Sequence, residues 1–236
     1  MYAWALATTS GPDLLNSALD SFRVFLEYVG TVAFAISGAV AASKRRMDLI
    51  GAVVLAGVVA VGGGTMRDLL LQRPVFWIEH PALVWVAIAT ALMIVPFARR
   101  RDLGALTRHR IVEMSDAFGL AIFVVLGTGL ALDSGASPIA AVIVGVVNGV
   151  GGGILRDLFS AQMPEVFWNG HLYATAALGG AIVYWALDAW GVTPELVFWL
   201  SLVIILALRL LSLRLGWGVP SVATVQKREL QTESHA

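Results

Sequence analysis

The chain has 236 residues, of which 58% are apolar and 14% charged, with no cysteine and a formal net charge of zero. With its 24 glycines the apolar share reaches about 68%, against about 45–50% in soluble domains. This composition excludes a disordered chain and argues against a soluble globule. The cysteine count excludes disulfides and thiolate metal sites, and the balanced charge gives no basic field that would attract nucleic acid.

Seven segments are apolar and long enough to cross a bilayer as helices, which takes about 20 residues. They lie at residues 22–43, 49–71, 81–98, 111–132, 137–159, 171–190 and 195–213. None of them alternates apolar and polar residues as a barrel strand does. The sequence therefore predicts an all-α membrane protein with seven transmembrane helices, a short extracytoplasmic tail at 1–21 and a polar cytoplasmic tail at 216–236.

Basic residues gather in alternate loops, and this bias sets the orientation of a membrane protein. The main basic positions are Lys44, Arg45, Arg46, Arg99, Arg100, Arg101, Arg108, Arg110, Lys227 and Arg228. They share one side of the membrane only if the number of spans is odd. We therefore predict an N-terminus outside and a C-terminus in the cytoplasm, in the inner membrane of a bacterial or archaeal cell. The first six basic residues are also candidates for binding anionic lipid headgroups.

The chain contains an internal repeat with an offset of 89 residues. VGGGTMRDL at 61–69 matches VGGGILRDL at 150–158. Upstream, the same offset pairs Glu27 with Asp116, Gly30 with Gly119, Phe34 with Phe123 and Gly38 with Gly127. The repeat defines two three-helix halves at 22–98 and 111–190, joined by a basic loop at 99–110, and a seventh helix at 195–215 without a partner. Three spans per half insert the second half inverted, as in transporters and channels built from inverted repeats.

Both copies of the motif begin with a glycine triplet inside a predicted span. The triplets are Gly62, Gly63 and Gly64 in the second span and Gly151, Gly152 and Gly153 in the fifth. Glycine weakens a helix, and two breaks in equivalent spans of inverted halves indicate a central permeation or binding site. We therefore predict kinks at both triplets. The alternative is close helix packing, which small residues also permit.

Each triplet is followed by an Arg-Asp pair. Its members are Arg67 and Asp68 in the first half and Arg156 and Asp157 in the second. Adjacent helical residues point about 100° apart, so direct pairing within a motif is not expected. The sequence instead predicts an Arg67–Glu27 pair and, by symmetry, an Arg156–Asp116 pair. That arrangement leaves both motif aspartates free to face an ion. The alternative is that the arginines extend to the lipid headgroups.

Three uncharged polar residues also lie within predicted spans. Asn148 precedes the second triplet by three residues, where its amide suits a hydrogen bond between helices or the lining of a permeation path. Ser37 and Thr128 are expected to bond back to carbonyls of their own helices.

Two GGGxxRD motifs in a three-plus-three-plus-one arrangement of spans resemble the prokaryotic branch of the trimeric intracellular cation (TRIC) channel family, which overlaps the "glycine transporter" domain family. The resemblance covers roughly residues 22–215. It implies a homotrimer with one pore in each protomer, bounded by the kinked second and fifth helices and permeable to potassium and other monovalent cations. It also implies that the glycine, arginine and aspartate residues of both motifs belong to the pore.

Three function classes fit the sequence: a passive monovalent-cation channel, a secondary transporter of a small neutral solute such as glycine, and a structural membrane protein. An enzyme is not expected, because the sequence offers no Ser/His/Asp set and symmetry places Glu27 and Asp116 near opposite faces. We expect no cofactor and no bound metal beyond a permeant K⁺ or Na⁺. The expected partners are membrane lipids and further copies of the chain, and not nucleic acid.

Overall fold

The structure, a computed structural model, describes residues 11–98, 104–167 and 172–218, with side chains from residue 21 onward. All regular elements in these ranges are helical. The α-helices are α1 (Gly11–Lys44), α2 (Leu49–Leu70), α3 (Phe76–Glu79), α4 (Ala82–Ala98), α5 (Ala105–Asp133), α6 (Pro138–Phe159), α7 (Ala174–Ala189) and α8 (Pro194–Leu215), and one 3₁₀ turn, η1, covers Glu165–Phe167.

Each predicted span coincides with one α-helix, and of the described α-helices the short α3 corresponds to no span. Five of these helices, α1, α2, α5, α6 and α8, are long and apolar enough to cross a membrane. The apolar helices α4 and α7 are shorter, with 17 and 16 residues, which corresponds to about 24–26 Å at 1.5 Å per residue. The protein is thus an all-helical, multi-pass membrane protein, while the count of seven crossings stays a prediction.

Two predicted boundaries differ from the structure by more than three residues. Helix α1 begins at Gly11, so the second half of the predicted 1–21 tail is helical. Proline at position 12 suits this start, because its fixed φ is compatible with a first helical turn. Helix α5 begins at Ala105, inside the predicted basic loop at 99–110. Apolar residues and arginines, which are good helix formers, extend α5 toward this end.

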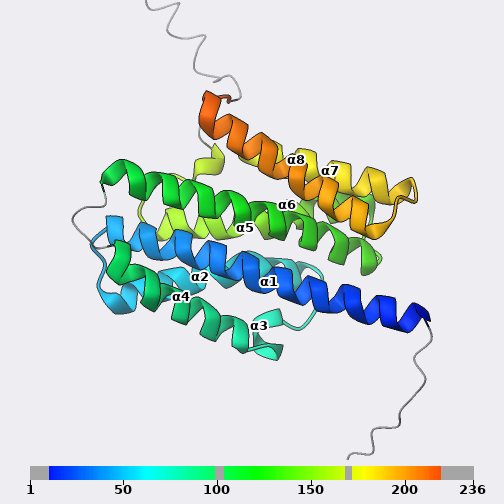
Figure 1. Ribbon diagram of the computed structural model, residues 1–236, viewed down its shortest axis with the longest axis horizontal. Helices are drawn as coiled ribbons and strands as arrows, with labels where there is room; N and C mark the ends of the chain where they lie inside the picture. The colour runs from blue at the N-terminus through cyan, green and yellow to red at the C-terminus, as the bar shows by residue number, and fades with distance from the viewer. Residues whose placement is uncertain (1–10, 99–103, 168–171, 219–236) are drawn as a thin grey trace, which may run out of the picture.

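The two halves pack against each other in opposite directions. Helices α1 and α5 lie side by side, as Figure 1 shows, with α4 at one edge of the bundle and α7 and α8 at the other. A β-carbon placed on Gly30 would lie 2.8 Å from the ring of Phe123, and one placed on Gly119 would lie 2.5 Å from the ring of Phe34. Moving four residues forward on α1 therefore moves four residues backward on α5, which confirms antiparallel packing of these equivalent helices.

The glycine triplets mark the crossing of α2 and α6. Gly63 lies directly against the backbone carbonyl of Asn148, and Gly152 lies against the backbone carbonyl of Val59. Under the 89-residue offset these two contacts are equivalent, so both lie close to the pseudo-two-fold axis. No β-carbon fits at either position without moving the opposite helix.

The expected kinks are not confirmed. Both helices are continuous through their triplets, so the unwound turn that glycine permits is not formed. The physical reason lies in the contacts. The opposite helix fills the bare faces of the first two glycines of each triplet, and the rings of Phe76 and Tyr173 fill those of Gly64 and Gly153. An intact helix also keeps its own backbone hydrogen bonds within the membrane. Close packing, the alternative that the sequence left open, describes the triplets in this structure.

Candidate functional site

A buried charged cluster lies at the end of α2. We call Glu27, Arg67 and Asp68 the first cluster. Arg67 is only 2% exposed; its Nε donates to Asp68 Oδ1 at 2.8 Å and its Nη1 donates to Glu27 Oε1 at 3.4 Å. The guanidinium also lies 5.3 Å from the centre of the Phe76 ring. Arg67 is therefore held on several sides within the protein.

Asp68 fixes the chain that follows α2. Its Oδ2 accepts a hydrogen bond from the backbone N–H of Phe76 at 2.8 Å, while Oδ1 accepts from Arg67. Phe76 is the first residue of α3, whose N–H has no partner within its own helix. The Asp68 carboxylate thus connects the end of one helix to the start of the next.

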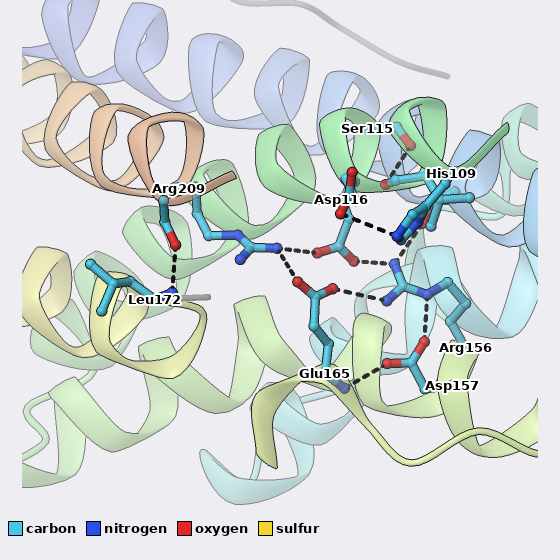
Figure 2. Close-up of polar contacts among 12 residues, drawn as sticks. His109, Ser115, Asp116, Arg156, Asp157, Glu165, Leu172 and Arg209 are labelled. Carbon is cyan, nitrogen blue, oxygen red and sulfur yellow. Dashed lines mark hydrogen bonds and ion pairs between the residues drawn. The ribbon is translucent and has the colours of Figure 1, made fainter. Parts of the chain in front are cut away.

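The second half repeats this arrangement around Arg156, as Figure 2 shows. Arg156 Nε donates to Asp157 Oδ1 at 2.8 Å, and Nη1 donates to Asp116 Oδ1 at 2.6 Å. Asp157 Oδ2 accepts from the backbone N–H of Glu165 at 2.9 Å. Phe76 and Glu165 each follow their motif aspartate by eight residues, so the repeat extends to the hydrogen bonds.

The predicted Arg67–Glu27 and Arg156–Asp116 pairs are confirmed. Two other expectations are wrong. Each arginine does pair with the aspartate next to it, because a long, flexible side chain can bridge the angular separation of adjacent residues. Consequently the aspartates are not free: both oxygens of Asp68 and of Asp157 accept hydrogen bonds. Extension of the arginines to the headgroups is also excluded, since Arg156 is only 3% exposed.

The uncharged polar residues divide between helix and interhelix contacts. Thr128 Oγ1 donates to the carbonyl of Val124 in its own helix at 2.8 Å, as expected. Ser37 differs, because its hydroxyl accepts from Arg156 Nη1 at 2.9 Å. Asn148 Nδ2 donates to the Phe123 carbonyl on α5 at 2.6 Å, which confirms an interhelical hydrogen bond.

The second cluster contains two charged residues that the sequence analysis missed. Together with Asp116, Arg156 and Asp157, it includes Glu165 of η1 and Arg209 of α8. Arg209 is fully buried; its Nη2 lies 2.9 Å from Glu165 Oε1 and 3.9 Å from Asp116 Oδ2. An arginine inside an apolar span is itself a signal for a functional site. Glu165 carries no such signal, because the first half has Phe76 and not an acid eight residues after its motif aspartate.

The two clusters have the same formal charge. The first holds one guanidinium and two carboxylates, and the second holds two guanidiniums and three carboxylates. Each therefore carries one net negative charge when all its groups are ionised. A surplus of negative charge in a low-dielectric surrounding favours cations over anions.

A cavity of about 390 Å³ reaches the first cluster, where Arg67 and Glu27 line it. Its lining also includes the Arg23–Asp133 ion pair, with N–O separation of 2.9 Å and side chains that are 44% and 51% exposed. Glu27 is 17% exposed. The cavity thus leads from a half-exposed ion pair to a buried arginine, and Glu27 is the acid of the first cluster that meets it.

The candidate lipid-binding residues are described only in part. Lys44, Arg45 and Arg46 are exposed at the end of α1 and in the following turn, where Arg46 has a φ of 55°. A pocket of about 290 Å³ is lined by Ser43, Arg46, Met47 and Arg108. Arg99, Arg100 and Arg101 lie outside the described residues.

Comparison with known proteins places the chain among prokaryotic membrane proteins. Residues 24–99 and 113–189 match the family described as "Glycine transporter". The UPF0126 inner membrane protein YadS of Escherichia coli is 39% identical over 84% of this chain and 95% of its own length. The UPF0126 membrane protein YvgT of Bacillus subtilis is 34% identical over 83% of this chain and 94% of its own.

Solved structures give the same family. The TRIC trimeric intracellular cation channel orthologue from Rhodobacter sphaeroides is 38% identical, with a TM-score of 0.78, over 84% of this chain and all of that one. A prokaryotic TRIC channel crystallised in 0.5 M KCl is 26% identical, with a TM-score of 0.78, over 84% of this chain and 99% of that one. With these structures, the glycine transporter match and the UPF0126 relatives in agreement, the chain belongs to the prokaryotic TRIC family.

Proposed function

We propose that this protein is a monovalent-cation channel, permeable to potassium, with one pore through each protomer of a homotrimer. The observation that carries the proposal is the pair of inverted charged clusters, each with one net negative charge, in a chain whose solved relatives are TRIC cation channels. Equivalent negative clusters at opposite ends of inverted halves attract cations from either side of the membrane.

The proposed path begins in the 390 Å³ cavity beside Glu27 and Arg67. It passes Asn148 and the two glycine triplets and ends at Asp116 and Arg156. Because α2 and α6 pack directly at the triplets, conduction requires these helices to separate or bend there. Glycine permits such a bend more readily than any other residue, so packing and bending are two states of the same element.

The test is ion flux through the purified protein in potassium-loaded liposomes. We expect a channel to release the loaded potassium passively. Valinomycin added afterwards should then release little more. No flux above that of protein-free liposomes, in protein shown to be folded and inserted, would contradict a channel.

The second candidate function is a carrier for a small zwitterion such as glycine. The cavity favours it in one respect, since its lining offers guanidinium groups for a carboxylate and Glu27 for an ammonium group. Its volume also falls in the range of small-molecule sites, about 300–1,000 Å³. Saturable uptake of labelled glycine that depends on a sodium or proton gradient would favour the carrier over the channel.

We further propose that the N-terminus lies outside the cell and that the basic end of α1 faces the cytoplasm. There Lys44, Arg45 and Arg46 would meet anionic headgroups of the inner leaflet, each contributing about 1 kcal/mol to the attraction. A reporter fused after residue 236 should therefore be active in the cytoplasm. Activity of that fusion only outside the cytoplasm would invert the orientation.

A further inference from the structure

Arg209 breaks the symmetry between the two clusters. It comes from α8, the helix that has no partner in the repeat, and its side chain is fully buried. The guanidinium carbon lies 4.4 Å above the centre of the Tyr173 ring. Figure 2 shows the group extending from α8 toward Asp116 and Glu165. α8 therefore delivers a positive charge that balances the carboxylate of Glu165, and neither residue has an equivalent in the first cluster.

The guanidinium of Arg209 makes little use of its directional donors. Nη2 donates to Glu165 at 2.9 Å, but Nε and Nη1 have no hydrogen-bond partner among the described residues, although both are buried. Arg156 differs, since its Nε and Nη1 donate to three oxygens, those of Asp157, Ser37 and Asp116. Arg209 thus contributes to its surroundings mainly as a positive charge.

The groups around Arg209 have the chemistry of a cation site. Two carboxylate oxygens, Glu165 Oε1 and Asp116 Oδ2, and one aromatic face meet at the same guanidinium. Asp116 Oδ2 has no hydrogen-bond partner among the described residues. Buried carboxylates require a compensating charge, and an aromatic face attracts cations, most strongly when they are desolvated.

We propose that Asp116, Glu165 and the Tyr173 ring form a monovalent-cation site, and that Arg209 occupies this site as a tethered cation. Removal of the guanidinium leaves the ring and two carboxylates, each still paired with Arg156 through its other oxygen, around the space that the group occupied. Free guanidinium fits that space by shape and charge, and potassium fits it by charge. In the wild-type protein the tethered group excludes both.

The binding test uses the full-length Arg209→Ala variant in detergent. Guanidinium chloride at low millimolar concentration should raise its melting temperature in a saturable way, because a ligand that binds only the folded state stabilises it. The wild-type protein should show no rise, and neither should Arg214→Ala, which removes an exposed arginine from the same helix. Equimolar urea controls for the shape of guanidinium without its charge.

A second variant identifies the ligands of the site. Adding Glu165→Gln to Arg209→Ala should weaken guanidinium binding at least about tenfold, because one of the two charges that face the cation is lost. Arg209→Lys should behave as the wild type, since its ammonium group keeps a positive charge in the site. A guanidinium response in Arg209→Lys equal to that in Arg209→Ala would overturn the proposal, as would no response in Arg209→Ala.

One outcome is that the Arg209→Ala variant folds only with a bound cation. In that case guanidinium or potassium added during purification should restore the folded protein, and urea should not. Failure of both cations to restore it would count against the site. Any effect of the site on transport rests on the proposed channel function. Binding of a cation to the site does not. Stabilisation by guanidinium without potassium flux in any variant would therefore retain the site and reject the channel.

Discussion

The rings of Phe34 and Phe123 stack, with centroids 5.3 Å apart and planes within 7° of parallel. These two residues are equivalent under the 89-residue offset, so each half of the repeat contributes the same side chain to one contact. Both rings are buried, and each lies in a space left by a glycine of the other half, Gly119 for Phe34 and Gly30 for Phe123. The contact joins α1 and α5 across the pseudo-two-fold axis.

Replacing either stacked ring with alanine should destabilise the protein by similar amounts. We expect about 3 kcal/mol for Phe34→Ala and for Phe123→Ala, at the low end for such substitutions, because packing rather than exclusion of water holds helices together in a bilayer. The double variant should cost less than the sum, since both changes remove the same contact. Thermal unfolding measures this, with exposed Phe25→Ala as the control.

Replacing a glycine with alanine at the helix crossing should destabilise the protein, whereas the same replacement elsewhere in α2 should not. A methyl group on Gly63 overlaps the carbonyl of Asn148, so Gly63→Ala should cost about 1–3 kcal/mol through overpacking and should reduce potassium flux. In the same helix Gly57 has no atom within 4 Å of its β-carbon position. Gly57→Ala should therefore be neutral or stabilising by up to about 1 kcal/mol. Equal effects of the two substitutions on unfolding would show that overpacking at the crossing does not cause the loss of stability in Gly63→Ala.

Neutralising Glu27 should lower potassium flux more than it lowers stability. Glu27→Gln removes the only acid of the first cluster that lines the described cavity, and we expect flux to fall roughly twofold to tenfold, by an amount that shrinks as salt is raised. Glu79→Gln is the matched control, because this exposed carboxylate on α3 does not line the cavity. Flux measured per folded protein at two salt concentrations would distinguish an electrostatic effect from lost protein.

Neutralising Asp68 should lower stability more than it lowers potassium flux. Both of its oxygens hold structural partners, Arg67 and the Phe76 N–H, so Asp68→Asn should cost about 1.5–3 kcal/mol, as expected for a hydrogen bond to a charged group. Asp157→Asn should cost a similar amount by symmetry. Unchanged thermal unfolding in both variants would mean that these aspartates do not connect consecutive elements in the membrane.

Breaking the Arg156–Asp116 pair from one side should be worse than removing both charges. Arg156→Gln leaves Asp116, which is fully buried, with the more distant Arg209 at 3.9 Å as its cationic partner among the described residues. We expect a loss of about 3–5 kcal/mol, as for other buried pairs that lose one partner. Adding Asp116→Asn should restore part of that stability. A double variant less stable than Arg156→Gln would show that the two residues do not act as a pair.

The sequence by itself determined the helical membrane architecture, the repeat and two of its ion pairs. Apolar length predicts spans because the bilayer requires a fixed length of apolar helix. A charged residue within a span needs a partner, which predicts an Arg67–Glu27 pair. The offset of 89 residues then predicts the Arg156–Asp116 pair, because a contact made in one half is expected in the other. Both inferences need only local composition and internal symmetry.

Only the tertiary structure decided which groups complete the clusters and what the glycines contact. The bond from Asp68 to the Phe76 N–H depends on the path of the chain after α2, and residue spacing does not specify that path. Arg209 reaches Asp116 and Glu165 because α8 packs beside α5 and α7. The repeat cannot predict this contact, since α8 has no equivalent in the first half. The glycine triplets likewise suit both a bend and a close crossing, and the position of the opposite helix decides between them.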